Sequence, residues 1–211
     1  MDAIDSYIKD MSSQMGEVLE ELERETFLRT STPRMISGAV QGRLLNMLVK
    51  MLRPRRVLEI GTFTGYSAIC MAMALDRDAL LHTCERDDEH EEMILSFIQK
   101  ARLEDKICLH IGSALDIVPK LEESFDMVFI DGNKREYPAY YDMLFQSGSL
   151  HSGSVIVADN ILWYGKVANQ APQNDIQTNR IRAFNTMVRN DPRVENVILP
   201  LRDGLNLIRV L

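Results

Sequence analysis

The chain is poor in several features that would mark it for particular environments. Its 211 residues include three cysteines, Cys70, Cys84 and Cys108, and no C-x-x-C pair. The odd count argues against a disulfide framework, and the missing pair argues against a thiolate zinc site. No apolar run approaches the ~18 residues of a membrane span, and the first residues lack a signal peptide's basic start and apolar run. We therefore expect a cytoplasmic protein with no membrane segment.

Positive charge is also scarce. Lys and Arg number 24 against 31 Asp and Glu, which gives a formal net charge of −7. This balance disfavours broad, nonspecific binding to nucleic acid or anionic lipid. Hydrophobic residues make up 45% and charged residues 26%, as is typical of globular proteins. The length suits one α/β domain with a sizeable core, so residues 1–211 are predicted to form a single domain.

Hydrophobic periodicity divides the chain into a helical preface, residues 1–52, and a core, residues 55–211. In the preface, helices are predicted at 4–22 and 38–52, with a break at 30–33. In the core, short apolar runs alternate with helical patterns. Strands are predicted at 57–60, 80–84, 107–111, 127–130, 154–158, 194–200 and 205–211. Helices are predicted at 66–75, 88–102, after Ser113, at 137–146 and at 176–190, with a polar loop at 164–175.

This alternation of strands and helices predicts an α/β fold with a mostly parallel sheet, covered by helices on both faces. The pair Asp203-Gly204 separates the last two strands and is a hairpin signal. The seven-stranded sheet is therefore predicted to include an antiparallel C-terminal strand. No internal repeat or second domain is evident.

Polar residues follow five of the predicted strands directly or nearly so: Gly61, Glu85, Ser113, Asp131 and Asp159. In a parallel sheet, ligands bind beyond the carboxyl ends of the strands. The functional site is therefore expected at this edge of the sheet.

The turn after the first strand contains Gly61 and Gly65, which permit a tight turn and the close approach of a ligand. Glu85 ends the second strand, where a carboxylate can accept the hydroxyls of a ribose. The dinucleotide pattern G-x-G-x-x-G is absent, and acidic Glu59 precedes the first glycine. These features favour S-adenosylmethionine, which is cationic and carries no phosphate. The alternative is that the glycines serve only packing.

Asp131 and the pair Asp159-Asn160 follow two strands that are predicted to be neighbours. Two carboxylates and an amide are hard oxygen ligands, which suit Mg²⁺, with Mn²⁺ or Ca²⁺ as alternatives, rather than zinc. The other interpretation is that these residues are solvated loop acids or helix N-caps. Lys134 lies close in sequence and is a candidate general base, or an ordinary surface lysine.

Several motifs together resemble the cation-dependent class I O-methyltransferases, a family that includes catechol O-methyltransferase and the caffeoyl-CoA O-methyltransferases. The motifs are residues 59–67, 130–134 with Tyr137, 158–163, 35–38 with Gln41-Gly42, and Asp203-Gly204. The resemblance runs from about residue 30 to the C-terminus and implies a Rossmann-like class I methyltransferase fold. Asn133 departs from the aromatic residue that mammalian catechol enzymes carry before the catalytic lysine.

The resemblance also implies roles for individual residues. Those expected to contact the cofactor are Ser37, Glu59, Gly61, Thr62, Ser67, Glu85, Ser113, Ala114 and Asp131. Asp131, Asp159 and Asn160 are expected to bind the metal, and Lys134 and Asp131 to serve in catalysis.

The expected reaction is methyl transfer to a small hydroxylated aromatic molecule with vicinal hydroxyls, such as a catechol. One alternative substrate is a hydroxylated uridine of transfer RNA, for which Arg34, Arg43, Arg53, Arg55 and Arg56 would offer a basic surface. A nicotinamide (NAD) oxidoreductase and a noncatalytic scaffold are further alternatives. The apolar stripe of the preface, together with the resemblance, predicts a homodimer.

Overall fold

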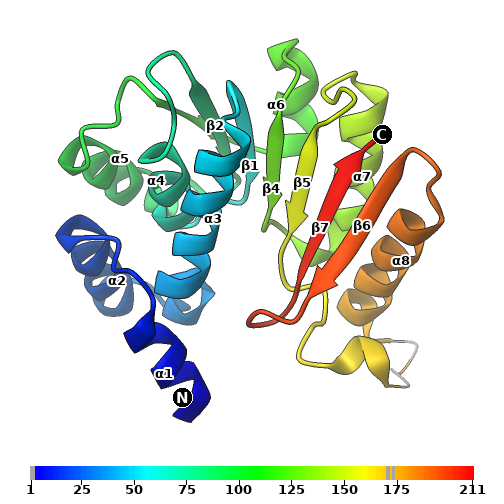
Figure 1. Cartoon of the computed structure of the whole chain (residues 1–211), viewed down its shortest axis with the longest axis horizontal. Coiled ribbons are helices and arrows are strands. Elements are labelled where there is room, and N and C mark those ends of the chain that lie inside the picture. The colour runs from blue at the N-terminus through cyan, green and yellow to red at the C-terminus, as the bar shows by residue number, and fades with distance from the viewer. Residues whose placement is uncertain (1–2, 170–171, 173) are drawn as a thin grey trace.

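A seven-stranded sheet forms the centre of the protein, with strand order β3-β2-β1-β4-β5-β7-β6 (Figure 1). The computed structural model describes residues 3–169, 172 and 174–211. The strands are β1 (Arg56–Ile60), β2 (Leu80–Glu85), β3 (Ile107–Ile111), β4 (Met127–Ile130), β5 (Val155–Ala158), β6 (Val194–Leu199) and β7 (Leu205–Val210). The first five strands pair in parallel, and β7 is antiparallel to both β5 and β6. The predicted fold is thus confirmed, including the antiparallel C-terminal strand.

Helices cover both faces of the sheet and give the core two halves. On one face pack α2 (Glu17–Arg29), α3 (Gly38–Leu52), α4 (Tyr66–Ala72) and α5 (Glu91–Lys100). On the other face pack α6 (Ala114–Leu121), α7 (Tyr137–Gln146) and α8 (Ile176–Asn190). Side chains alternate along each strand, so the apolar strands serve both halves. None of the helices in the described residues is long and apolar enough to cross a membrane.

The N-terminal segment differs from its prediction. In place of one helix over 4–22, the structure has α1 (Ala3–Met11) and α2, separated by a turn that ends at Gly16. Gly16 has φ 106° and ψ 167°, a conformation that is open to glycine and costly for other residues. Arg43 of α3 donates to the backbone oxygens of Ser13 and Gln14 in this turn. Apolar periodicity alone therefore missed the break.

Other boundaries shift by smaller amounts. The predicted helix over 88–102 is a short 3₁₀ turn, η2 (Asp88–His90), followed by α5, and the predicted helix over 66–75 ends at Ala72. Two further 3₁₀ turns, η1 (Pro33–Met35) and η3 (Lys134–Glu136), flank the carboxyl edge of the sheet, and η4 (Lys166–Ala168) lies in the predicted polar loop. Residues 170, 171 and 173 of that loop lie outside the described residues.

The central strands end at the same level, and this brings the predicted site residues together. Ile60 pairs with Cys84 of β2 and with Ile130 of β4, which in turn pairs with Ala158 of β5. The residues one step further are therefore neighbours across the sheet edge. The Asp131 amide donates to the Ile60 oxygen at 2.8 Å, and the Asp159 amide donates to the Ile130 oxygen at 2.9 Å.

Gly61 makes the close spacing at this edge possible. Its φ is +99°, and a Cβ there would lie 2.6 Å from the Asp131 carbonyl oxygen and 2.8 Å from the Gly132 nitrogen. Contacts this short involve backbone atoms, so a side chain would force β1 and β4 apart. The glycine thus fixes the distance between the loop after β1 and Asp131.

We expect Gly61→Ala to lower the free energy of unfolding by more than about 3 kcal/mol, because the forced positive φ alone costs ~1–3 kcal/mol and the backbone must also move. The matched control is Gly148→Ala, since Gly148 has φ +70° and a Cβ there meets nothing within 4 Å among the described residues. The control should lose only the free energy that the forced positive φ costs. Urea denaturation of both variants measures the difference, and equal losses would contradict the account.

Candidate active site

A pocket of about 880 Å³ opens at the carboxyl edge of the sheet, a size typical of small-molecule sites. It lies beside the point where the connections from β1 and β4 lead to opposite faces, as is usual for this class of sheet. All the predicted site residues but one line it: Ser37, Gly61, Thr62, Ser67, Glu85, Ser113, Ala114, Asp131, Lys134, Asp159 and Asn160. The exception, Glu59, lies behind the wall and is fully buried.

Glu85 holds the glycine loop in place. Its Oε2 accepts the backbone N–H groups of Thr62 at 3.1 Å and Phe63 at 2.6 Å, and its Oε1 accepts that of Asp87 at 3.0 Å. Phe63 has φ 51°, so the loop adopts a strained shape that these bonds support. Glu85 therefore shapes the pocket at the end of β2, the position predicted for ribose binding.

Glu59 sits in a buried polar network under the loop. Its carboxyl group accepts hydrogen bonds from Ser67 Oγ and Thr83 Oγ1, each at 2.5 Å, and Thr62 Oγ1 lies 2.5 Å from Thr83 Oγ1. Burial raises the pKa of Glu59 to about 8, although the two hydroxyl donors oppose this shift. The predicted contact between Glu59 and the cofactor remains a prediction.

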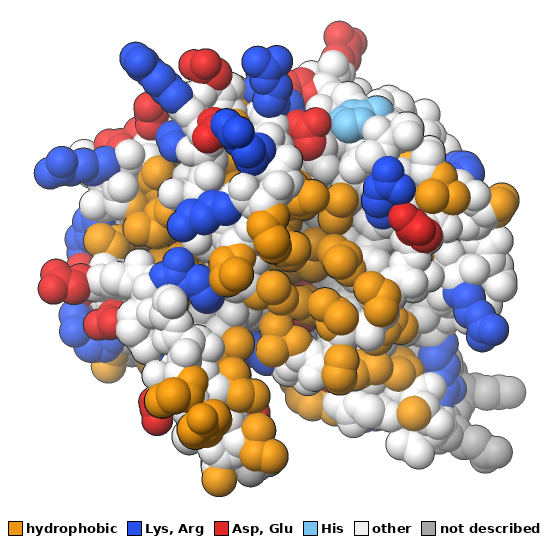
Figure 2. All heavy atoms as spheres, in the orientation of Figure 1, with side chains coloured by type: hydrophobic (Ala, Val, Ile, Leu, Met, Phe, Trp, Pro, Cys, Tyr) orange, Lys and Arg blue, Asp and Glu red, His pale blue; other side chains and the backbone are white. Residues whose placement is uncertain are grey.

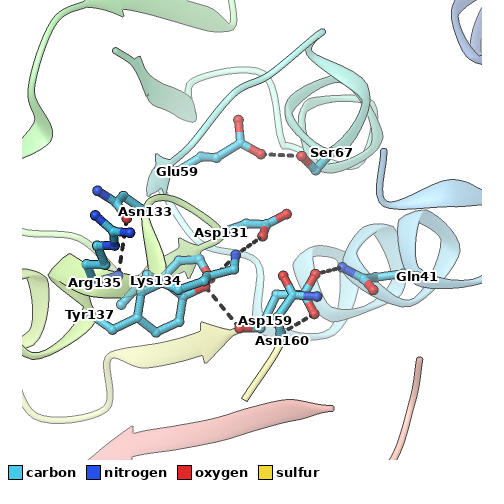
Figure 3. A network of polar contacts seen from close by, with 11 residues as sticks. Gln41, Glu59, Ser67, Asp131, Asn133, Lys134, Arg135, Tyr137, Asp159 and Asn160 are labelled. Atoms are coloured by element: carbon cyan, nitrogen blue, oxygen red, sulfur yellow. Dashed lines mark hydrogen bonds and ion pairs between the residues drawn. The ribbon is translucent and has the colours of Figure 1, made fainter. Parts of the chain in front are cut away.

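Asp131, Asp159 and Asn160 lie together on one wall of the pocket (Figure 3). Asp159 is almost completely buried, and its two oxygens accept the Asn160 N–H at 2.6 Å and Gln41 Nε2 at 2.6 Å. Burial, and then the negative charge of Asp131, raise the pKa of Asp159 to about 6. The structure thus concentrates two carboxylates in a largely dry corner of the pocket.

Lys134 closes this corner. Its Nζ donates to Asp131 Oδ1 at 2.6 Å and to the Tyr137 hydroxyl at 3.0 Å (Figure 3). The Tyr137 hydroxyl lies 3.1 Å from the backbone carbonyl oxygen of Ile130 and 2.9 Å from that of Asp159. Burial keeps the pKa of Tyr137 well above its usual value. The Tyr137 hydroxyl and the Asp131 carboxylate therefore hold Lys134 Nζ inside the pocket.

An aromatic segment forms the outer rim. Trp163 and Tyr164 have φ values of 47° and 54°, and both line the pocket. The Tyr164 N–H donates to Asp203 Oδ1 at 2.5 Å, which ties this strained segment to the turn between β6 and β7. The two aromatic residues thus line the same pocket as Asp131, Asp159 and Asn160.

Sequence reasoning gave Gln41 and Thr83 no role, although both contact predicted site acids. Gln41 shares one face of α3 with Leu45 and Val49, at intervals of four residues, and all three are fully buried. A polar residue on an otherwise apolar face of a helix was the signal in the sequence that could have indicated a role for Gln41. Within the described residues, no group of three or more His, Cys, Asp and Glu side chains lies close enough to hold a metal. The candidate metal site instead combines two acids, Asp131 and Asp159, with the amide of Asn160.

Comparison with known proteins defines the class. A sequence profile described as O-methyltransferase matches residues 9–211. A caffeoyl-CoA O-methyltransferase of Populus kitakamiensis is 34% identical, over 100% of this chain and 94% of its own length. A caffeoyl-CoA O-methyltransferase of Eucalyptus gunnii is 35% identical, over 99% of this chain and 87% of its own length.

Solved structures agree with the sequence relatives. The O-methyltransferase TomG of Streptomyces achromogenes, in complex with S-adenosylmethionine, has a TM-score of 0.91 and 31% identity, covering 99% of this chain and 96% of its own. An O-methyltransferase of Bacillus cereus, in complex with S-adenosylhomocysteine, has a TM-score of 0.90 and 30% identity, with coverage of 99% and 97%. Fold and relatives define an S-adenosylmethionine-dependent methyltransferase. The chain belongs to the O-methyltransferase family, of the caffeoyl-CoA O-methyltransferase type. The nicotinamide and scaffold alternatives are set aside.

The raised pKa of Glu59 predicts a pH dependence of stability. Between about pH 4.5 and 8 the folded protein keeps a proton on Glu59 that the unfolded chain releases, so the stability due to this group is lost as pH rises through that window. Glu59→Gln, which is neutral at all pH values, should lose less stability than the wild type between pH 5.5 and 8. The difference should exceed ~1 kcal/mol, since one pKa unit corresponds to about 1.4 kcal/mol.

The measurement is urea denaturation of both proteins at the two pH values. Comparing the proteins cancels the other titrating groups, including Asp159, His82 and His110. Parallel pH profiles would show that Glu59 is ionised in the folded protein.

Proposed function

We propose that this enzyme methylates a hydroxyl group of a small catechol-like molecule, with a divalent cation held by Asp131, Asp159 and Asn160. The observation that carries the proposal is the register of β4 and β5, which places both carboxylates on one wall of the cofactor pocket. Chelation by two adjacent hydroxyls would suit a site that offers a cation beside an aromatic rim.

The pocket fits S-adenosylmethionine. Gly61 lets the backbone approach a ligand closely, and Glu85 lies at the end of β2, where it can accept ribose hydroxyls. Ser113 and Ala114, at the start of α6, would flank the adenine, and Asp131 would lie near the cofactor. The substrate would then lie beyond Asp131, toward Trp163.

The donor set fits a hard divalent cation. Carboxylate and amide oxygens are the ligands that Mg²⁺ prefers, with Mn²⁺ or Ca²⁺ as alternatives. The buried Asp159 lies beside the partly buried Asp131, whose negative charge repels it, and a cation would relieve this repulsion. Asn160 adds a neutral oxygen donor next to them. When bound, such a cation would supply Lewis acidity and stabilise negative charge on a substrate oxygen.

The residues of the chain supply positioning and proton transfer. In its neutral amine form, Lys134 has a lone pair at Nζ and is placed to receive the hydroxyl proton there. The Tyr137 hydroxyl holds that nitrogen in the pocket. The substrate oxygen then forms a bond to the methyl carbon while the bond from that carbon to sulfur breaks, which leaves S-adenosylhomocysteine. Because a sulfonium charge is neutralised, orientation of the reactants is the main contribution, worth up to ~7–11 kcal/mol.

The transfer RNA alternative receives less support from the structure. Of the five arginines that would bind phosphates, Arg34 alone lines the pocket, within the described residues. Arg53 and Arg56 form ion pairs with Asp76 and Glu123. Comparing methylation of a catechol with methylation of bulk transfer RNA separates the two substrates.

We also propose that the enzyme is a homodimer. All residues of α1 are exposed, including the apolar Ile4, Tyr7, Ile8 and Met11. Figure 2 shows hydrophobic side chains gathered over this end and across the middle of the same face. A second copy would cover such a face reciprocally. Sedimentation velocity should give one species of about twice the 24.1 kDa chain mass, and a monomer at micromolar concentration would refute the dimer.

The metal requirement predicts loss of activity in Asp159→Asn. The variant should methylate a catechol more than about 100-fold more slowly, since several kcal/mol of charge stabilisation are lost. Excess chelator should have the same effect on the wild type, and added Mg²⁺ should reverse it. Binding of S-adenosylhomocysteine, measured by calorimetry, is the control and should change little. Full activity in excess chelator would refute the metal claim.

The role of Lys134 predicts a selective loss of turnover. Lys134→Met should lower kcat about 10²–10⁴-fold, as is typical when a general base is removed, and should leave S-adenosylhomocysteine affinity nearly unchanged. Lys100→Met is the control, because Lys100 pairs with Glu21 on the surface. Steady-state kinetics with a catechol measures the effect, and an unchanged kcat would remove Lys134 from the mechanism.

A further inference from the structure

Gln41 is a buried amide that reaches the candidate metal site from the N-terminal helices. It lies in α3 and is fully buried, and its Nε2 donates to Asp159 Oδ2 at 2.6 Å (Figure 3). The contact joins residues 118 positions apart in the chain. It therefore links the helical preface directly to an acid at the carboxyl edge of β5.

The chemistry of the contact fixes the orientation of the amide. Gln41 Nε2, a donor, lies 2.6 Å from Asp159 Oδ2, so the NH₂ group faces the carboxyl group. The Gln41 Oε1 atom is then left buried with no hydrogen-bond partner among the described residues. A buried acceptor without a partner is costly, so the amide is not explained by its own hydrogen bonding. What it provides is a donor for Asp159.

Asp159 has a donor on each oxygen. Oδ2 accepts from Gln41, and Oδ1 accepts the backbone N–H of Asn160 at 2.6 Å. Two donors on opposite oxygens prevent rotation of the carboxylate and leave one lone pair of each oxygen for another partner. Gln41 therefore lies one layer behind the site and sets the direction in which Asp159 presents its oxygens.

We propose that Gln41 is a positioning residue for cation binding, which fixes Asp159 in the orientation that a divalent cation requires. The inference rests on the proposed metal site. Partners behind metal ligands orient them, and removing such a partner lowers metal affinity about 10–100-fold.

A second buried amide on the same helix provides a matched control. Asn46 is also almost fully buried, and its Nδ2 donates to the Cys70 carbonyl oxygen at 2.8 Å. That bond joins α3 to α4 and touches none of the proposed metal ligands. Asn46→Leu removes a buried amide that bonds only within the N-terminal half of the core. Gln41→Met removes a buried amide that bonds to a proposed metal ligand.

The experiment is titration of wild type, Gln41→Met and Asn46→Leu with Mn²⁺, followed by calorimetry and by electron paramagnetic resonance of the ion. Gln41→Met should bind Mn²⁺ about 10–100-fold more weakly than the wild type. Asn46→Leu should lower the melting temperature and keep wild-type Mn²⁺ affinity. S-adenosylhomocysteine affinity should stay within about twofold in Gln41→Met, by the same positioning argument.

The Mn²⁺ affinities of the wild type and of Gln41→Met separate the role of Gln41 from the metal site itself. Unchanged or tighter Mn²⁺ binding by Gln41→Met, with a wild type that binds, would overturn the role of Gln41 and leave the proposed function standing. A wild type that binds no Mn²⁺ would refute the metal site and the inference together. If Gln41→Met fails to fold, Gln41→Asn keeps a buried amide and withdraws the donor by one methylene, and it should show the same weakening.

Discussion

The site depends on one constraint: the parallel strands β1, β4 and β5 end in register with one another. Their register places Gly61, Asp131 and Asp159 side by side, joined by backbone hydrogen bonds from one strand to the next. A shift of one residue in the pairing of β1 with β4, or of β4 with β5, would separate Gly61, Asp131 and Asp159. The glycine at the end of β1 has the same origin, because only a residue without a Cβ fits against the Asp131 backbone. Fold and pocket therefore share one geometric cause.

Buried carboxyl groups are the second feature of the site. Glu59 and Asp159 both carry raised pKa values because burial removes water from their carboxyl groups. Hydrogen-bond donors, rather than salt bridges, satisfy them: hydroxyls for Glu59, and an amide with a backbone N–H for Asp159. Lys134 instead pairs with the more accessible Asp131. Carboxylates that line the pocket favour cationic ligands, such as the sulfonium of S-adenosylmethionine and the divalent ion proposed above.

Much of this could be predicted from the sequence, because the signals are local. The ranges 38–52, 137–146 and 176–190 match α3, α7 and α8, since each has strong apolar periodicity. The break at Gly16 was missed because the apolar spacing continues through it, and backbone dihedrals decide it. Gln41 received no role for a different reason. Its partner lies 118 residues away, and one sequence does not show which helix packs behind which strand.

The central claim is a cation site between the ends of β4 and β5. The most direct measurement is anomalous scattering from crystals grown with Mn²⁺ and S-adenosylhomocysteine. The account predicts one strong peak within about 2.0–2.6 Å of oxygens from Asp131, Asp159 and Asn160, as hard cations require. A peak elsewhere, or no peak at millimolar Mn²⁺ with Lys134 still bonded to Asp131, would contradict this site.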